Sequence, residues 1–337
     1  MKQILQNTSI AKFLSFTIIA ILILSGELQA QPGTLDSSFG TNGKVVTTMS
    51  GYAFCTALQE DGKIIVAGLA KPEEVLILAR YNIDGNLDSS FGENGKVLTD
   101  LVPGYNFNYS QAKALAFQKD GKIVVTGYGY RDIGLYSDYD ILLVRYNADG
   151  SLDAGFGNNG VVINDFGDPN EFSYDVALQP DGKIVIGGLS GSMLVARYNT
   201  DGSPDITFGD VGWKKYNTGF ANTIAIQPDA KIILGGVNSD KYTDRFMLCR
   251  IQSDGNVDNS FGNNGTVVTD FAPGSGDEQI NSIVLQPDGK IIAGGSTDLE
   301  NGNIALARYQ LNGLLDTSFG INGKVTNHHT IITKTSV

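Results

Sequence analysis

Apolar residues in this chain fall into short runs separated by turns rich in glycine, aspartate and asparagine. In the first unit of the pattern the runs occupy residues 44–47, 55–59, 63–68 and 75–81. The Asp61-Gly62 pair between the second and third runs is typical of a tight hairpin, because glycine tolerates the positive φ that such turns need. No segment repeats its apolar residues at helical spacing. The pattern therefore predicts an all-β chain with four strands in each unit.

The third and fourth runs are continuously apolar, as residues 64–67 and 75–79 illustrate. A strand with one face in water alternates apolar and polar residues, whereas a strand buried on both faces need not. A small sheet covered on both faces by similar sheets is a propeller blade. The run before the recurring glutamine, for example 176–178, is rich in small and branched residues. It suits the crowded innermost position, which leaves the Gly-x-Val strand outermost.

The four-run unit occurs five times in register. A phrase containing Asp-x-x-Phe-Gly recurs at steps of 52, 65, 52, 53 and 58 residues, beginning at Asp36, Asp88, Asp153, Asp205, Asp258 and Asp316. Between these marks lie a glutamine turn, at Gln59, Gln118, Gln179, Gln227 and Gln286, and an arginine, at Arg80, Arg145, Arg197, Arg250 and Arg308. Periods of this length indicate a solenoid or propeller, in which each repeat buries its apolar faces against its neighbours.

We therefore predict a β-propeller of five four-stranded blades. One strand is left over, because six Gly-x-Val strands accompany five copies of the other three. A closed ring uses either the first of them, at 44–47, or the last, at 323–326, to complete its terminal blade. The alternative is an open or incomplete propeller-like array.

The repeat resembles the delta-60 repeat family of exported bacterial proteins. The resemblance is carried by motifs such as Gln-Pro-Asp-Gly-Lys-Ile-Ile at 286–292 and Leu-Asp-Ser-Ser-Phe-Gly at 87–92, and it extends from about residue 35 to 325. It implies a propeller-like fold and a secreted or surface setting. It brings no catalytic residues.

The chain is expected to have three parts. Residues 1–30 are predicted to be a signal peptide, because Lys2 and Lys12 lead into an apolar stretch at 13–24 that is shorter than the ~20 residues a membrane span needs. Residues 31–326 are predicted to form a propeller of delta-60-type repeats, and 327–337 a C-terminal tail. No membrane span is expected. The protein is predicted to be secreted or periplasmic, and its association with the cell surface and its oligomeric state are left open.

Charge and histidine content narrow the functional classes. The formal net charge is −12, which repels phosphate backbones and makes nucleic acid an unsuitable partner. The two histidines, His328 and His329, fall in the tail, so the repeats offer no histidine base or zinc ligand. No catalytic or metal-ligating residue is assigned. Enzymes that use paired carboxylates stay possible, but the sequence nominates no pair.

Two recurring features favour structural roles. Each of the five arginines is expected to pair with the aspartate eight residues later, since guanidinium and carboxylate match in a two-pronged geometry. Cys55 and Cys249 belong to non-adjacent repeats, too distant for the ~7 Å that a disulfide spans, and Cys249 reads as a small core residue. No cofactor is expected. The segment 82–88 faintly resembles a calcium loop, but a hydrogen-bonded Asx turn explains the same letters, and calcium is kept only as an alternative.

Spacing inside the repeat varies at two connections only. The distances from arginine to aspartate and from that aspartate to its following glycine are constant. That glycine lies 16, 23, 19, 15 and 21 residues before the next glutamine, and the glycine ending the third run lies 12, 18, 9, 14 and 13 residues before the arginine. Because strands in an antiparallel blade alternate in direction, both variable connections leave from one rim. Insertions collected on one face mark a predicted binding surface.

The second copy has the longest variable connections and is rich in tyrosine. Its candidate ligand-binding residues are Tyr105, Phe107, Tyr109, Tyr128, Tyr130, Arg131, Tyr136 and Tyr139. Such side chains offer stacking area and hydrogen bonds to carbohydrate or protein ligands, although the same rings can instead form a satellite core under their own loops. The predicted function is an exported non-enzymatic binding or adhesion module. The alternatives are a carboxylate-based polysaccharide hydrolase or lyase and a purely structural envelope or matrix protein.

Overall fold

The computed structural model describes residues 33–101, 107–132, 137–216, 219–239, 243–271, 277–297 and 303–327. The predicted signal peptide at 1–30 lies outside these residues. The chain divides into two units, Met1–Val45 and Val46–Val337. In the first unit, the described residues form turns with isolated bridges at Lys44. No helix in the described residues is long and apolar enough to cross a membrane.

The second unit contains 20 strands in five antiparallel sheets, and the order of strands in every sheet is their order in the chain. Sheet one consists of β1 (Gly51–Leu58), β2 (Ile64–Ala70), β3 (Val75–Tyr81) and β4 (Lys96–Thr99). Sheet two consists of β5 (Tyr109–Phe117), β6 (Ile123–Asp132), β7 (Ser137–Tyr146) and β8 (Val161–Asn164). Sheet three consists of β9 (Glu171–Leu178), β10 (Ile184–Ser190), β11 (Ser192–Tyr198) and β12 (Trp213–Tyr216).

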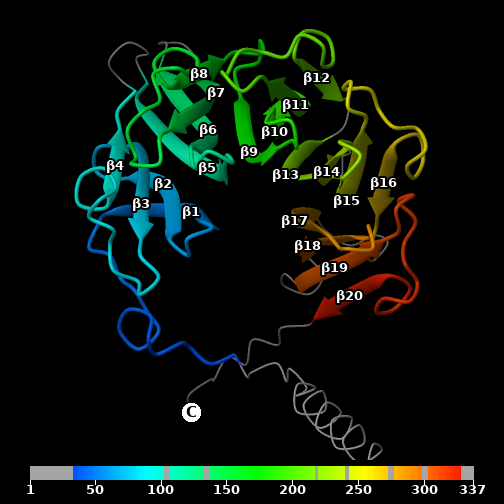
Figure 1. Ribbon diagram of the computed structural model, residues 1–337. Helices are drawn as coiled ribbons and strands as arrows, with labels where there is room; N and C mark the ends of the chain where they lie inside the picture. The colour runs from blue at the N-terminus through cyan, green and yellow to red at the C-terminus, as the bar shows by residue number, and fades with distance from the viewer. Residues whose placement is uncertain are drawn as a thin grey trace, which may run out of the picture. The chain divides into compact units, whose positions relative to one another are not determined.

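Sheet four consists of β13 (Phe220–Ile226), β14 (Ile232–Ser239), β15 (Asp244–Ile251) and β16 (Thr266–Thr269). Sheet five consists of β17 (Glu278–Leu285), β18 (Ile291–Thr297), β19 (Asn303–Tyr309) and β20 (Lys324–Asn327). The first strands β1, β5, β9, β13 and β17 pack one against the next, so the sheets of this unit fan around a common centre as propeller blades (Figure 1). This confirms the predicted all-β fold of five four-stranded blades. The strand before the glutamine is innermost and the Gly-x-Val strand outermost, as predicted.

Blades are held together by apolar residues that interleave between consecutive sheets. Ile65 and Leu78 of sheet one, for example, share a fully buried cluster with Val125 and Leu142 of sheet two. Equivalent clusters join the later pairs of sheets. The continuously apolar third strands are explained by this burial on both faces.

The cysteines behave as the sequence suggested. Cys55 and Cys249 are free thiols. Cys249 is buried in the cluster between sheets three and four, where it serves as a small core residue. Burial raises the pKa of each thiol to about 12, which suppresses the reactive thiolate.

The leftover strand predicted at 44–47 does not form. Lys44 makes only isolated bridges. The fourth strand of every sheet is the Gly-x-Val strand that comes after the third strand of that sheet in the chain, so β20 completes sheet five. Thr47 nevertheless makes the contact that the threonine of an outermost strand makes with a tyrosine of the next blade. Its Oγ1 lies 2.6 Å from Tyr81 Oη, as Thr99 lies from Tyr146 Oη in the next blade.

Blade five leaves one face uncovered. Ile304 on β19 is 55% exposed, whereas the residues at the same repeat position in the other blades, Leu76, Ile141, Met193 and Phe246, are 0% exposed. Those four residues are covered by the following blade. The propeller therefore ends with an open face on its last blade.

Candidate ligand-binding surface

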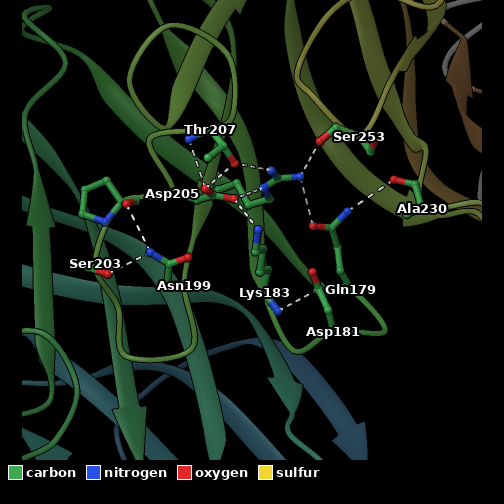
Figure 2. Close-up of polar contacts among 11 residues, drawn as sticks. Gln179, Asp181, Lys183, Asn199, Ser203, Asp205, Thr207, Ala230 and Ser253 are labelled. Carbon is green, nitrogen blue, oxygen red and sulfur yellow. Dashed lines mark hydrogen bonds and ion pairs between the residues drawn. The ribbon is translucent and has the colours of Figure 1, made fainter.

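One rim of the propeller carries the connections of constant length and a network repeated in every blade. In blade three, Arg197 Nε donates to Asp205 Oδ2 at 2.7 Å and Lys183 Nζ donates to the same oxygen at 2.8 Å (Figure 2). Arg197 Nη1 donates to the Ser253 carbonyl of blade four at 2.5 Å. The expected pairing of arginine with aspartate is confirmed in all five blades. We call this side the fixed rim.

Phenylalanine completes the fixed-rim network. The Arg197 guanidinium lies 4.5 Å from the ring centroid of buried Phe208, and the other four arginines lie equally over the phenylalanine of their phrase. In Asp258, burial raises the carboxyl pKa, but hydrogen bonds from Ser260 and the charges of Arg250 and Lys231 outweigh it and lower the pKa to about 2. The arginine thus joins two blades while its carboxylate stays ionised at neutral pH.

A groove of about 660 Å³ lies on the fixed rim between blades two and three. It is lined by Gln118, Lys122 and Arg145 of one blade and by Gln179 and Asp181 of the next. These are residues that the repeat supplies to every blade. The groove is therefore a feature of the scaffold, and we place the candidate site elsewhere.

The opposite rim carries the connections of variable length. Strands one and two of each blade are joined at the fixed rim, so the antiparallel pairing places the connections from strand two to three and from strand four to the next blade together on the other side. We call this side the variable rim. Its location on one face agrees with the prediction from spacing.

A contiguous aromatic surface lies along the variable-rim ends of the strands. Its members are Tyr52 and Phe54 on β1, Tyr109 on β5, Tyr128 and Tyr130 on β6, Tyr139 on β7, Phe172 and Tyr174 on β9, and Phe220 on β13. Ring centroids lie 5.6 Å apart for Tyr109 and Tyr130, 4.7 Å for Tyr128 and Phe172, and 6.1 Å for Tyr174 and Phe220. Lys113 connects Phe54 to Tyr128. We call these nine residues the aromatic surface.

The aromatic surface opens into a cleft of about 460 Å³ between blades one and two. Tyr52, Phe54 and Tyr109 supply rings to its wall, and Lys71, Glu74 and Gln111 supply polar groups. Tyr52 and Phe54 are exposed, and the other rings of the surface are half-buried. Rings with one wet face and one packed face are suited to stacking on a ligand.

The structure separates the residues predicted for this site. Tyr109, Tyr128, Tyr130 and Tyr139 form the centre of the aromatic surface. Phe107 does not join them. It is 1% exposed and belongs to the core between blades one and two, which corrects its assignment as a ligand-contacting residue. Tyr105 and Tyr136 lie outside the described residues, and their assignment stays a prediction.

Arg131 uses its charge within the protein. Its Nη2 donates to Asp138 Oδ2 at 2.8 Å and pairs with the buried carboxylate of Asp140. Burial raises the pKa of Asp140 to about 6, and the Arg131 charge offsets only part of this effect. Arg131 therefore compensates a buried acid and is not a free cation for a ligand.

Asp140, Asp165 and Glu171 are the group that can hold a metal ion in the described residues, with carboxylate oxygens within 4.8 Å of one another. Glu171 already accepts hydrogen bonds from the Phe166 amide at 2.7 Å and the Ser190 hydroxyl at 2.9 Å. Burial raises the pKa of Glu171 as well. These contacts account for Glu171 as an anchor of the loop before β9. The Asx turn expected at 82–88 is present, with the Asn86 amide donating to Asp84 Oδ1 at 2.9 Å.

Sequence reasoning missed the parts of the surface that come from other blades. Tyr52, Phe172 and Phe220 all lie seven residues before a repeat glutamine, and Phe54 and Tyr174 lie five before it. Alignment of the copies on that glutamine reveals them, whereas loop length alone points only to the second copy. Their joining into one surface depends on the packing of adjacent first strands.

The fold and the repeated fixed-rim network define a β-propeller built from one recurring unit. The chain belongs to the family described as domain of unknown function (DUF5122) beta-propeller, whose model matches residues 59–91, 118–156, 179–208, 227–261 and 286–319. Each matched segment runs from a glutamine turn to the phenylalanine of the phrase, so it contains strands two and three of a blade and leaves the connection from strand four to the next blade outside. No curated protein matches the chain.

Several solved structures are similar to much of the chain at low sequence identity. A protein of unknown function from Bacteroides caccae is 12% identical, with 80% of this chain and 84% of that chain covered and a TM-score of 0.49. Hydrazine synthase from Kuenenia stuttgartiensis is 13% identical, covering 85% and 68%, with a TM-score of 0.49. Virginiamycin B lyase from Staphylococcus aureus is 12% identical, covering 79% and 83%, with a TM-score of 0.43.

Proposed function

We propose that this protein is an exported, non-enzymatic binding module whose ligand is a carbohydrate held on the aromatic surface. The observation that carries the proposal is the continuity of the rings across four blades on the variable rim. Sugars present flat faces of C–H groups that pack on aromatic rings, and tyrosine adds a hydroxyl for hydrogen bonding. A chain of rings along a rim fits an extended oligosaccharide.

The cleft beside Tyr52 and Tyr109 supports this choice. Its volume of about 460 Å³ is within the range of ~300–1,000 Å³ of small-molecule sites. Gln111, Lys71 and Glu74 on its wall can fix the orientation of hydroxyl groups. A protein ligand could use the same rings, since aromatic residues also dominate protein–protein contacts, and binding to an oligosaccharide array separates the two.

A carboxylate-based hydrolase or lyase is less well supported. Asp140 and Glu171 are a close acidic pair next in sequence to Tyr139 and Phe172 of the aromatic surface, and they are 1% and 0% exposed. Acids that act on a glycosidic bond must contact it. These two are enclosed and are engaged by Arg131 and by backbone amides.

The resemblance to delta-60 repeats of exported bacterial proteins supports export, as does the lysine-led apolar stretch within residues 1–30. We propose a secreted or periplasmic location. Fractionation of cells that express the full chain tests this. Recovery of the unprocessed chain, with residues 1–30 retained, from the cytoplasm contradicts it.

Binding of the purified protein to an array of oligosaccharides tests the proposed function. Tyr109→Ala and Tyr128→Ala remove rings from the aromatic surface, whereas Phe117→Ala removes a ring from the fixed-rim end of the same strand β5. Loss of stacking costs about 1 kcal/mol for each ring. We expect affinity to fall about fivefold or more for the two tyrosine variants and to change less than twofold for Phe117→Ala.

Three outcomes contradict the proposal. Equal binding by all variants removes the aromatic surface as the site. Absence of binding to every glycan, with capture of a protein ligand that depends on Tyr128, favours a protein-binding module. Release of new reducing or unsaturated sugar ends identifies an enzyme.

A further inference from the structure

All five first strands contain a β-bulge at the same place. The register slips between Ala53 and Cys55 in β1, and at the equivalent positions of β5, β9, β13 and β17. A bulge places one extra residue on a strand and redirects its side chain, and bulges are frequent next to functional sites. The repeat therefore produces one redirected side chain in each blade.

A glycine in the second strand makes each bulge possible. A Cβ added to Gly68 would lie 1.8 Å from the Tyr52 carbonyl oxygen. At the corresponding glycines of the other blades, Gly127, Gly188, Gly236 and Gly295, the equivalent carbonyl would lie 1.8–2.0 Å away. Backbone approach this close excludes every other residue. The repeat thus fixes the backbone of the bulge.

The bulged residues themselves are chemically different: Phe54, Lys113, Tyr174, Asn222 and Asn281. A purely structural position can keep one residue type in every blade, as the arginine of the fixed rim does. Here the backbone is constant and the side chain varies. This combination is expected of positions that determine which ligand is bound.

Four of these side chains reach the seams between neighbouring blades. Lys113 Nζ of blade two lies 4.0 Å from the ring centroid of Phe54 in blade one. The Tyr174 ring lies 6.1 Å from Phe220 of blade four, and Asn222 Nδ2 donates to the Ile280 carbonyl of blade five at 2.9 Å. Phe54 and Asn281 are exposed, and the other three are half-buried. A ligand that lies across the first strands meets all of these seams.

Lys113 has unusual surroundings for a charged side chain. Its ammonium lies between the rings of Phe54 and Tyr128, and within the described residues it has no carboxylate at ion-pair distance. The lysine of every glutamine turn, by contrast, is paired with an aspartate. Burial between these rings lowers the pKa of Lys113, because its charge is only partly solvated there. Cation–π contacts stabilise a cation by about 1 kcal/mol, but they do not give the Lys113 ammonium a counter-ion.

We propose that the five bulged residues are the specificity-determining contacts of the carbohydrate site and that Lys113 selects a sugar carrying an anionic group. This inference rests on the proposed function. The shared chemistry is a carboxylate or a sulfate on a sugar that stacks against Phe54 and Tyr128. In that position the anion supplies the counter-ion that Lys113 lacks in the protein.

The test measures the affinity of the full mature chain for three oligosaccharides of equal length by calorimetry. The probes are an oligogalacturonate, a sulfated galacto-oligosaccharide and a neutral galacto-oligosaccharide. Lys113→Met removes the charge and keeps the length of the side chain, and Lys113→Arg restores a cation. Lys119→Met is the matched control, because Lys119 follows the same strand at the fixed rim.

We expect Lys113→Met to weaken binding of an anionic probe at least tenfold and to change binding of the neutral probe less than twofold. Lys113→Arg should restore most of the affinity, and Lys119→Met should bind as the unmodified protein does. The anionic probe that loses more affinity identifies carboxylate or sulfate as the preferred group. Removal of an incompletely solvated charge should leave the melting temperature unchanged or raised, which separates lost contact from lost folding.

Two results overturn the inference and are distinguishable from failure of the proposed function. If the unmodified chain binds the neutral probe as tightly as both anionic ones, Lys113 does not select charge, although a carbohydrate site stands. If Lys113→Met binds an anionic probe normally, the anion lies elsewhere. If none of the probes and no array glycan binds, the proposed function itself fails and the inference falls with it.

Discussion

The two rims of the propeller are built by the same repeat, but one is constant in its residues and connection lengths and the other varies in both. On the fixed rim, each blade presents an arginine, an aspartate, a lysine and a phenylalanine in one arrangement, as Arg197, Asp205, Lys183 and Phe208 do in blade three. On the variable rim, connections differ in length, and in the described residues the aromatic surface extends over four of the five blades. A residue that recurs in every blade stabilises a feature that every blade has. A residue that differs from blade to blade at an equivalent position contributes to a property of the protein as a whole.

The difference teaches where stability and recognition reside. The fixed rim ties consecutive blades through bonds such as that from Arg80 Nη1 to the Ala148 carbonyl, at 2.6 Å. The variable rim holds rings that are only partly covered by protein. Substitutions on the fixed rim should therefore lower the free energy of unfolding, and substitutions of the aromatic surface should mainly alter binding. Three predictions test this division.

The largest expected effect is that of Arg197→Gln on the fixed rim. The change leaves the buried carboxylate of Asp205 without its arginine and removes the bond to Ser253 in the next blade. Breaking a buried ion pair by removing one partner costs about 3–5 kcal/mol. Urea unfolding, followed by circular dichroism, should show this loss in the free energy of unfolding.

Arg308→Gln is the matched control in the last blade. In the described residues Arg308 bonds to Asp316 and Ser318 of its own blade, and its side chain is 19% exposed against 6% for Arg197. We expect a cost of about 1–2 kcal/mol, since solvent can replace part of the pairing. Equal costs for the two variants would contradict the inter-blade role of the arginine.

The repeat made much of this architecture predictable from sequence. Continuous apolar runs at 64–67 and 75–79 indicated strands buried on both faces, and the constant spacing from Arg80 to Asp88 indicated an ion pair. The strand predicted at 44–47 was wrong, because a Gly-x-Val segment pairs only where a third strand lies before it in the chain. The Gly-x-Val letters by themselves do not show whether a third strand precedes them.

The site was less predictable for two physical reasons. Phe107 and Tyr109 are near neighbours in an aromatic-rich loop, yet one is a core residue and the other part of the surface, and composition alone does not separate them. The bulges that redirect Phe54 and Lys113 depend on the register between two strands. Register is set by pairing and by the glycines opposite, and a single strand's sequence does not display it.

Gly188→Ala should have the next largest effect and tests whether the repeat fixes the bulge. The added Cβ would lie 1.9 Å from the Phe172 carbonyl oxygen, so β9 and β10 must separate and the bulge must relax. Such backbone strain costs about 2–4 kcal/mol. Unfolding in urea measures this cost, and loss of oligosaccharide binding should accompany it because Phe172 and Tyr174 move.

Gly121→Ala is the matched control for that change. Gly121 has a φ of +83° in the turn after β5 on the fixed rim, and the added Cβ would meet nothing closer than Ala148 at 3.7 Å. The left-handed conformation alone costs about 1–2 kcal/mol in a residue with a Cβ. Oligosaccharide binding should be unchanged. A Gly188→Ala variant that is no less stable than Gly121→Ala would remove the bulge as a fixed feature of the repeat.

The smallest expected effect concerns the pH dependence of stability at the variable rim. Burial raises the pKa of Asp140 to about 6 in the folded protein, from 3.8 when it is exposed. The folded state therefore binds more protons than the unfolded state between about pH 4 and 6, and this group makes stability fall as the pH rises through that window. A shift of this size corresponds to at most about 3 kcal/mol, and solvent screening at the rim reduces the effect to about 1–2 kcal/mol.

Asp140→Asn removes this titration and should flatten the fall in unfolding free energy between pH 4 and 6. Asp201→Asn on the fixed rim is the control. Hydrogen bonds from Ser203 lower the pKa of Asp201, so its contribution is present above about pH 4 and is lost only as the pH falls further. Urea unfolding at pH 4, 5, 6 and 7 should thus give a flatter profile for Asp140→Asn and the unmodified slope for Asp201→Asn. The same slope in both variants would show that the buried acid of the variable rim is not protonated at mild acidity, and that the rims differ in recognition but not in their response to pH.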